Sequence, residues 1–154
     1  DLTTLGKYLA GGLTFGAFGG RADLLAAFDP DAGGELSQAG TFNNNVLSMT
    51  AVVATLTEIL TPEVIREVNE RGDRLRESLN EIFGSHHCPF EATGVGSMVA
   101  IHAEEPDLEL FFHAMLDMGW YLARRGFIAL SLEISDDLVD QFLVAVRSWA
   151  SQLD

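Results

Sequence analysis

The chain has 154 residues, about the length of one domain, and 47% of them are hydrophobic while 21% are charged. This is the composition of a folded globular protein, and it excludes a disordered or collagen-like chain. Nine basic against 23 acidic residues give a net charge of −14. Because this charge repels phosphate groups, we expect neither nucleic acid nor an anionic membrane surface as a partner.

Glycine is concentrated near the start of the chain. Nine of the 15 glycines lie within residues 1–40, among apolar residues. Such a segment predicts short buried strands joined by tight turns around a bound molecule. We place strands near Leu2–Leu5 and Phe15–Phe18, followed by a short helix over Ala22–Phe28 that ends at Asp29-Pro30.

The spacing of apolar residues changes after Asn45. Residues 46–60 are apolar on nearly all sides, which predicts a buried helix. Thr61-Pro62-Glu63 then combines an N-cap, a proline at the first helical position and an acid in the first turn. This pattern predicts a second, amphipathic helix that Gly84 closes. Its outer face carries two expected i,i+4 ion pairs, Glu67–Arg71 and Glu70–Arg74.

A second pattern of strands and helices fills the rest of the chain. Val95–Ala103 predicts a strand, Leu108–Leu122 a helix and Phe127–Ile134 another strand. Ser135 then caps a final helix with one apolar stripe. This order predicts a small α/β layer packed beside the glycine-rich part.

The sequence also bears on where the protein works. The longest uncharged stretch, Leu36 to Thr57, is interrupted by polar residues, so no membrane span is expected. No basic region precedes an apolar one at the N-terminus, so we expect no signal peptide. Cys88 is the single cysteine, which excludes an intramolecular disulfide and favours the cytoplasm. The chain opens without Met, and we expect an upstream segment of the same protein.

Lys7 is the only lysine, and the other eight basic residues are arginines. Its apolar, glycine-rich surroundings from Leu5 to Gly12 favour a buried amine whose pKa desolvation would lower. Such an amine attacks carbonyl carbons and forms Schiff bases. The alternative is a lysine that reaches solvent from the end of a strand. Placement alone favours this alternative, since most lysines are not catalytic.

Three further places could bind a ligand. Gly40-Thr41 lies in a loop before a helix, where backbone N–H groups and a hydroxyl suit a phosphate, although an asparagine among residues 43–45 could simply cap that helix. Arg125, after Arg124, could bind a carboxylate or could be a solvated loop charge. The cluster His86-His87-Cys88 has no further ligand at metal spacing, so we expect no metal site.

A longer motif gives these places a context. The run from Asp1 to Lys7, followed by Gly11-Gly12 and by Gly16 to Arg21, closely resembles the class III aminotransferases, which depend on pyridoxal phosphate. Gln38-Ala39-Gly40-Thr41 matches the phosphate-contacting loop of that family. The resemblance implies that Lys7 forms a Schiff base with the cofactor. It further implies that Gly40 and Thr41 contact the phosphate of the neighbouring subunit in a homodimer whose active site lies at the interface.

The resemblance also implies a fold, the C-terminal half of a fold-type I enzyme in the α/β class. Residues 1–60 would complete the large cofactor domain, residues 61–84 would form the interdomain helix, and residues 85–154 would form a small C-terminal α/β domain. In that family the acid that pairs with the pyridine nitrogen, the aromatic ring stacked on the cofactor and the glycine-rich phosphate turn lie upstream of the lysine.

Two short runs distinguish branches of the family. Phe42 to Val46 and Ala123 to Phe127 look more like the β-amino-acid transaminases than like the glutamate-1-semialdehyde aminomutases. The expected function is therefore transfer of an amino group between an amino acid, with a β-amino acid as one donor, and a keto acid, with Arg125 holding a substrate carboxylate. The alternatives are an aminomutase, or a truncated non-catalytic relative that acts as a dimerisation or binding module.

Overall fold

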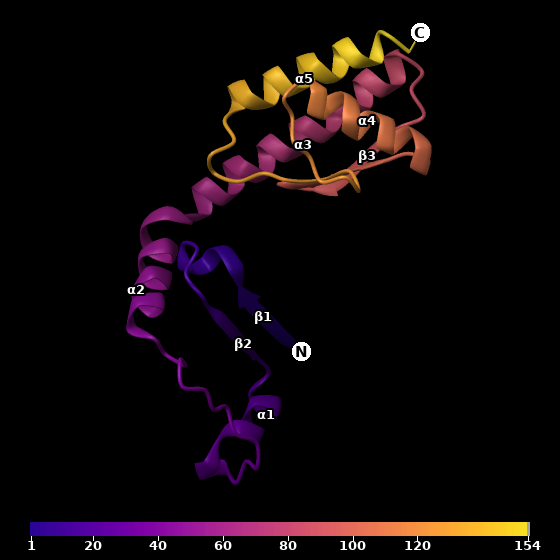
Figure 1. Cartoon of the computed structure of the whole chain (residues 1–154). Coiled ribbons are helices and arrows are strands. Elements are labelled where there is room, and N and C mark those ends of the chain that lie inside the picture. Colours follow the sequence, from indigo (N-terminus) through magenta and orange to yellow (C-terminus); the bar gives the residue numbers. More distant parts are fainter. Residues whose placement is uncertain (154) are drawn as a thin grey trace. The chain divides into compact units, whose positions relative to one another are not determined.

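The computed structural model describes residues 1–153. The chain divides into two compact units between Thr61 and Pro62. Figure 1 follows the chain from the short strands of the first unit to the helices and sheet of the second. No single helix within residues 1–153 is long and apolar enough to cross a membrane, and segments 46–59 and 62–85 pass that test only when taken together, by length and composition.

The first unit is built on a two-stranded hairpin. Strand β1 (Leu2–Gly6) pairs antiparallel with β2 (Gly16–Gly20), so that Leu2 lies opposite Gly20 and Gly6 opposite Gly16. Both predicted strands are confirmed. Most of their residues are exposed, so the expectation that they are buried is wrong. The reason is that the first unit, as the structure describes it, has no second layer over the hairpin.

Two helical segments follow the hairpin. Helix α1 (Ala22–Leu25) continues as a tighter turn over Ala26–Phe28, which confirms the helix predicted there. Helix α2 (Val46–Ala54) continues as a wider turn over Thr55–Ile59. The predicted helix over residues 46–60 is thus present.

The burial expected for α2 is not found. Val46 and Leu47 are 75% and 73% exposed, whereas Ser48 and Thr55 are buried. The buried side of the helix faces the turn after β1, where Ala10 is fully buried and the backbone of Gly11 lies near the Thr55 hydroxyl. Within residues 1–61 this turn is the segment before α2 that packs against the helix, and apolar residues such as Val46 and Leu47 stay in contact with solvent.

The second unit begins with its longest helix. Helix α3 (Pro62–Ser85) starts at the predicted proline and buries an apolar stripe that includes Leu75 and Leu79. The prediction of the ion pairs Glu67–Arg71 and Glu70–Arg74 on its outer face is wrong. Arg71 and Arg74 both contact Asp136, at 2.8 and 2.5 Å, because the first turn of another helix lies beside them.

The sheet of the second unit is antiparallel, in the order β3-β4-β5. Strands β3 (Glu91–Val95) and β4 (Met98–His102) form a hairpin, and β5 (Phe127–Ala129) pairs with β4. The strand predicted over Val95–Ala103 is therefore correct as β4, but it starts at the last residue of β3 and runs through the turn between the two strands, and the rest of β3 is not predicted.

The strand predicted over Phe127–Ile134 is shorter in the structure. Its pairing ends at Ala129, after which the Leu130 N–H donates to the Ser97 carbonyl at 2.9 Å. Ser97 lies in the turn before β4, so no strand remains opposite the residues that follow.

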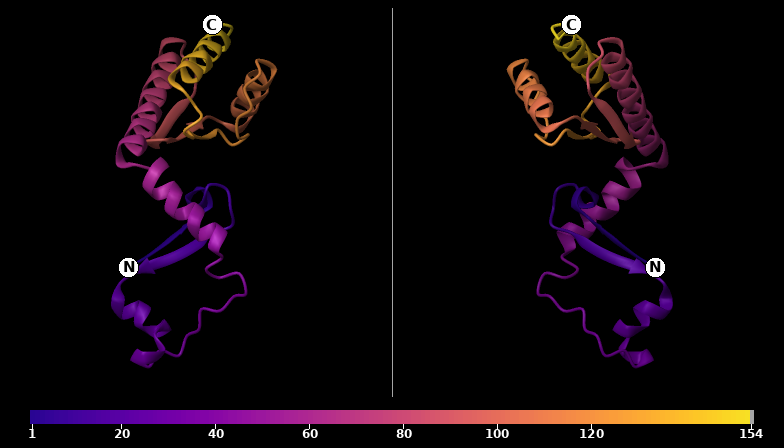
Figure 2. Two further views of the ribbon diagram at one scale, coloured as in Figure 1. Left: turned by 90° about the vertical axis from the view of Figure 1, so that its left-hand side faces the viewer. Right: turned by 90° about the vertical axis from the view of Figure 1, so that its right-hand side faces the viewer.

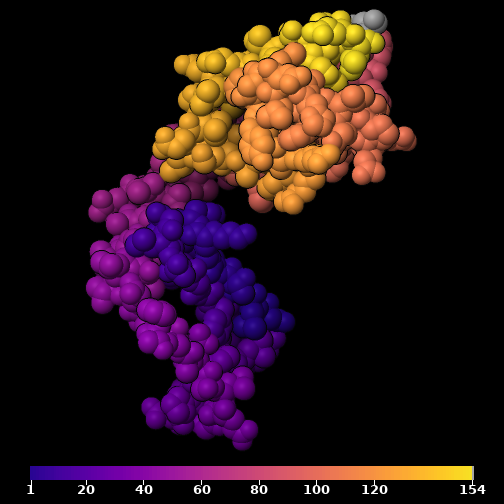
Figure 3. Space-filling model, in the orientation of Figure 1, coloured from indigo at the N-terminus to yellow at the C-terminus, as the bar shows by residue number. Residues whose placement is uncertain are grey.

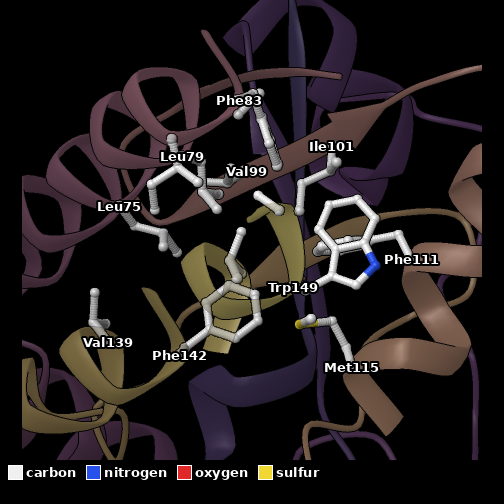
Figure 4. Close-up of a cluster of buried hydrophobic side chains, with 14 residues drawn as sticks. Leu75, Leu79, Phe83, Val99, Ile101, Phe111, Met115, Val139, Phe142 and Trp149 are labelled. Carbon is white, nitrogen blue, oxygen red and sulfur yellow. The ribbon is translucent and has the colours of Figure 1, made fainter. Parts of the chain in front are cut away.

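Three helices cover one face of this sheet (Figure 2). Helix α4 (Glu105–Asp117) is shorter than the predicted Leu108–Leu122, and α5 (Asp136–Ala150) starts after Ser135, whose hydroxyl accepts from the Leu138 N–H as predicted. The side chains of α4 and α5 lie side by side in Figure 3. The core between helices and sheet (Figure 4) consists of Leu75, Leu79, Ile82, Phe83, Ala92, Val99, Ile101, Phe111, Met115, Val139, Phe142, Val146, Trp149 and Ala150.

Candidate functional site

Lys7 stands at the end of β1 in an unusual backbone conformation. The strand pairing ends at Gly6, and Lys7 has a φ of 59°, in the left-handed region. Residues with a side chain rarely adopt this region, and at such a position the surrounding structure must hold the strain. The hairpin therefore fixes the direction in which the only lysine of the chain leaves the strand.

The residues after Lys7 form an open pocket of about 520 Å³. Gly11 and Gly12 turn the chain back with φ of 57° and 93°, and the Gly11 N–H donates to the Tyr8 carbonyl at 3.0 Å. Glycine allows these angles without steric cost. The lining offers one amine, two hydroxyl groups and no carboxylate; it consists of Lys7, Tyr8, Gly11, Gly12, Leu13, Thr14 and Phe15.

Of the two interpretations of Lys7, the structure agrees with the lysine that reaches solvent from the end of a strand, because its side chain is exposed rather than buried. The pocket is open, so the amine keeps its contact with solvent. This lining fits the aldehyde end of pyridoxal phosphate, because a primary amine is open to a ligand there. It provides no acid for the ring nitrogen of that cofactor.

Gly40 and Thr41 lie in an exposed turn and are not among the residues that line the Lys7 pocket. The Gly40 carbonyl accepts from the Asn43 N–H at 3.0 Å, which closes the turn. Asn45 caps α2, because its Oδ1 accepts from the N–H groups of Leu47 and Ser48 at 3.1 and 3.2 Å. An asparagine thus caps the helix, which is the alternative to a phosphate site given by the sequence. The phosphate contact of Gly40 and Thr41 stays a prediction.

Arg125 lies in the second unit, just before β5. Its guanidinium carbon is 5.7 Å from the centre of the Phe127 ring, within the range of a cation–π contact. The neighbouring Arg124 instead donates two hydrogen bonds to Glu109, one of them at 2.7 Å from Nε. This pairing lowers the pKa of Glu109 and raises the pKa of Arg124. The role of Arg125 toward a carboxylate stays a prediction.

The histidines of the second unit make local contacts. The His102 ring nitrogen lies 2.7 Å from the Thr93 hydroxyl, and His113 lies 3.1 Å from Glu109. Within residues 1–153 no three His, Cys, Asp or Glu side chains are grouped so that they could hold a metal ion.

Sequence reasoning missed three side chains at these places. Tyr8 and Thr14 are among the residues that line the Lys7 pocket, and the guanidinium of Arg125 lies over the Phe127 ring. Closeness in sequence to Lys7 and Arg125 was the only available signal for them. It could not show which way the side chains point.

The family of the chain follows from residues 1–148, which match the model of the class-III aminotransferases. The chain belongs to this family. It spans little more than a third of the length of the relatives it matches.

Among the relatives, the chain is 42% identical to the beta-phenylalanine transaminase of Variovorax paradoxus, over 97% of this chain and 37% of that protein. It is 36% identical to a glutamate-1-semialdehyde 2,1-aminomutase of Bacillus velezensis, over 91% of this chain and 35% of that protein. Among solved structures, the beta-phenylalanine aminotransferase from Variovorax paradoxus superposes with a TM-score of 0.91 at 40% identity, over 99% of this chain and 38% of the other.

Proposed function

We propose that this chain carries the catalytic lysine of a pyridoxal-phosphate-dependent aminotransferase, with Lys7 Nζ as the attachment point of the cofactor. The observation that carries the proposal is the position of the only lysine. It has a left-handed backbone conformation, is one of the residues that line a pocket with Gly11 and Gly12, and has an exposed side chain. Membership of the class-III family supports the same reading.

The residues of this chain take distinct roles in the proposal. Lys7 Nζ would hold the cofactor covalently and, when free, would take a proton from the substrate carbon as a general base and return one as a general acid. When bound, pyridoxal phosphate supplies an electron sink for the carbanion that this proton transfer creates. Gly40 and Thr41 hold its phosphate across a homodimer interface, and an upstream segment of the same enzyme supplies the acid for the ring nitrogen.

The proposed substrates are an amino acid donor and a keto acid acceptor, with a β-amino acid as the donor class. The 42% identity to a beta-phenylalanine transaminase supports this choice over an aminomutase, for which the identity is 36%. Arg125 binds the donor carboxylate, because a guanidinium presents two parallel N–H groups to one carboxylate. The fold assignment is part of the same proposal: residues 1–60 complete a large cofactor domain, residues 61–84 connect it, and residues 85–154 form the small domain.

The first experiment asks whether Lys7 reacts with the cofactor. The protein as it naturally occurs is incubated with pyridoxal phosphate, reduced with borohydride, and analysed by intact mass and peptide mapping. One phosphopyridoxyl group on Lys7, lost on competition with an amino substrate, is expected. Lys7→Arg, which keeps the charge but cannot form an imine, is the matched control and should carry no specific adduct.

The other outcomes separate the alternatives. No adduct on a folded protein would overturn the catalytic proposal and leave a dimerisation or binding module. Amino transfer within one substrate molecule, with no need for a second carbonyl compound, would favour the aminomutase. Transamination by Lys7→Ala would show that the assigned lysine is wrong.

A further inference from the structure

The two adjacent arginines before β5 differ in what they contact. The guanidinium of Arg124 donates from Nε and from one terminal nitrogen to the two oxygens of Glu109, which lies on α4. His113, one turn further along α4, contacts the same carboxylate. Glu109 therefore already accepts the two hydrogen bonds that Arg124 could otherwise donate to a carboxylate ligand.

Arg125 has no such partner within the residues that the structure describes. Its contact is the face of the Phe127 ring, at 5.7 Å from the guanidinium carbon. A cation–π contact uses the charge of the group and none of its five N–H donors. The N–H groups of Arg125 thus remain available to a ligand, while its guanidinium contacts the Phe127 ring.

The Phe127 ring is itself held in place by the sheet. Phe127 opens β5 and lies opposite Ala100 of β4. Side chains alternate between the faces of a sheet, so Phe127 lies on the opposite face from its neighbour Ile128, which packs against the core. The ring therefore stands on the sheet face that the three helices leave uncovered.

We propose that Phe127 is the positioning residue for Arg125. Because Glu109 already binds the guanidinium of Arg124, Arg125 alone of the pair recognises the substrate carboxylate. This inference rests on the proposed aminotransferase function and names the residue that orients its carboxylate site. The free energy of the cation–π contact sets the expected change in the affinity for the carboxylate. An exposed contact of this kind corresponds to about a two- to fivefold change in affinity.

The experiment uses the cofactor-loaded protein as it naturally occurs. KM and kcat are measured with a β-amino acid and with 1-phenylethylamine, an amine without a carboxylate. The dissociation constant of 3-phenylpropionate, a carboxylate that cannot react, is measured by titration calorimetry. The variants are Phe127→Leu, Phe127→Tyr, Arg125→Gln and Arg124→Gln.

Phe127→Leu is expected to raise KM for the β-amino acid and the dissociation constant of 3-phenylpropionate about two- to fivefold, with kcat nearly unchanged. Phe127→Tyr keeps the ring and should restore both. Arg125→Gln is expected to raise both by about 10- to 100-fold, and Arg124→Gln to leave them within about twofold. The KM for 1-phenylethylamine should stay the same in all four variants.

Three results would overturn the inference. They are equal effects of Phe127→Leu on the amine and the amino acid, no rescue by Phe127→Tyr, or weaker 3-phenylpropionate binding in Arg124→Gln than in Arg125→Gln. Failure of the proposed function looks different. In that case the wild-type protein transaminates no donor, while the calorimetric ranking of the four variants still decides the roles of Phe127 and Arg125.

Discussion

The side chain of Asn80 bonds both backbone groups of Ala92. Its Nδ2 donates to the Ala92 carbonyl and its Oδ1 accepts from the Ala92 N–H, each at 2.8 Å. Ala92 lies in β3, the edge strand of the sheet, and Asn80 lies on α3. The carboxamide thus takes the place of a neighbouring strand at this residue, and it closes an edge that could otherwise pair with another chain.

Removing this carboxamide should loosen β3. Asn80→Leu leaves both Ala92 groups without their partner, so we expect a loss of about 1–2 kcal/mol in the free energy of unfolding. Asn80→Asp keeps an acceptor for the Ala92 N–H but sets a second carboxylate oxygen against the Ala92 carbonyl oxygen, so it should also destabilise the protein. Urea unfolding and hydrogen exchange at the Ala92 amide measure the effect. Glu81→Ala, at the next residue on the exposed side of α3, is the control. Equal unfolding curves for Asn80→Leu and the wild type would contradict the role of Asn80.

Replacing two glycines of α3 by alanine should change the free energy of unfolding in opposite directions. A Cβ at Gly72 would lie 2.1 Å from the Gly96 carbonyl oxygen, in the turn between β3 and β4, whereas a Cβ at Gly84 would meet nothing within 4 Å. Gly72→Ala should therefore destabilise the protein by about 1–3 kcal/mol through overpacking. Gly84→Ala should stabilise it by about 0.5–1 kcal/mol, because alanine favours the helix. Thermal unfolding of both variants checks the signs, and stabilisation by Gly72→Ala would show that α3 does not pack this closely on the turn.

Asp136 makes the stability of the second unit depend on pH. Hydrogen bonds and charge from Arg71, and then from Arg74, hold the pKa of Asp136 below its ordinary value of 3.8. A carboxyl group whose pKa is lowered on folding stabilises the folded state above its unfolded pKa. That contribution is lost as the pH falls through the lowered value.

The matched variants for this ion pair are Asp136→Asn and Asp137→Asn, since Asp137 makes no ion pair within residues 1–153. Asp136→Asn should be less stable than the wild type near neutral pH, and the difference should shrink as the pH falls below about 4. Urea unfolding between about pH 6 and about pH 3 measures it. A difference in stability that grows toward acid pH would mean that the two arginines do not stabilise the ionised Asp136 carboxylate.

Thr41 should matter for cofactor retention if it contacts the phosphate as proposed. Thr41→Ala removes one hydroxyl donor to a charged group, which corresponds to about a 10- to 100-fold weaker affinity for pyridoxal phosphate. Thr41→Ser keeps the hydroxyl and should retain the affinity. Equilibrium dialysis of the cofactor measures both variants. Equal retention by Thr41→Ala and the wild type would remove Thr41 from the phosphate site.

The sequence by itself determined the elements whose signals are local. Pro62 and Ser135 begin helices because a proline at the first helical position and a capping hydroxyl act on backbone groups a few residues away. The hairpin around Lys7 follows in the same way from glycines that permit its turn, and the motif there led to the correct family.

Only the tertiary structure decided the contacts between elements. Asp136, rather than Glu67 and Glu70, pairs with Arg71 and Arg74, because α5 packs beside α3. The exposure of α2 was also unpredictable, since an apolar helix stays exposed where no layer covers it.

The difference between Arg124 and Arg125 has the same origin. The two side chains are adjacent in the sequence, yet one is bound to Glu109, 15 residues away, and the other rests on Phe127. Which arginine is free to bind a ligand depends on where α4 and β5 place their side chains. Those positions follow from the packing of the core, which no local pattern specifies.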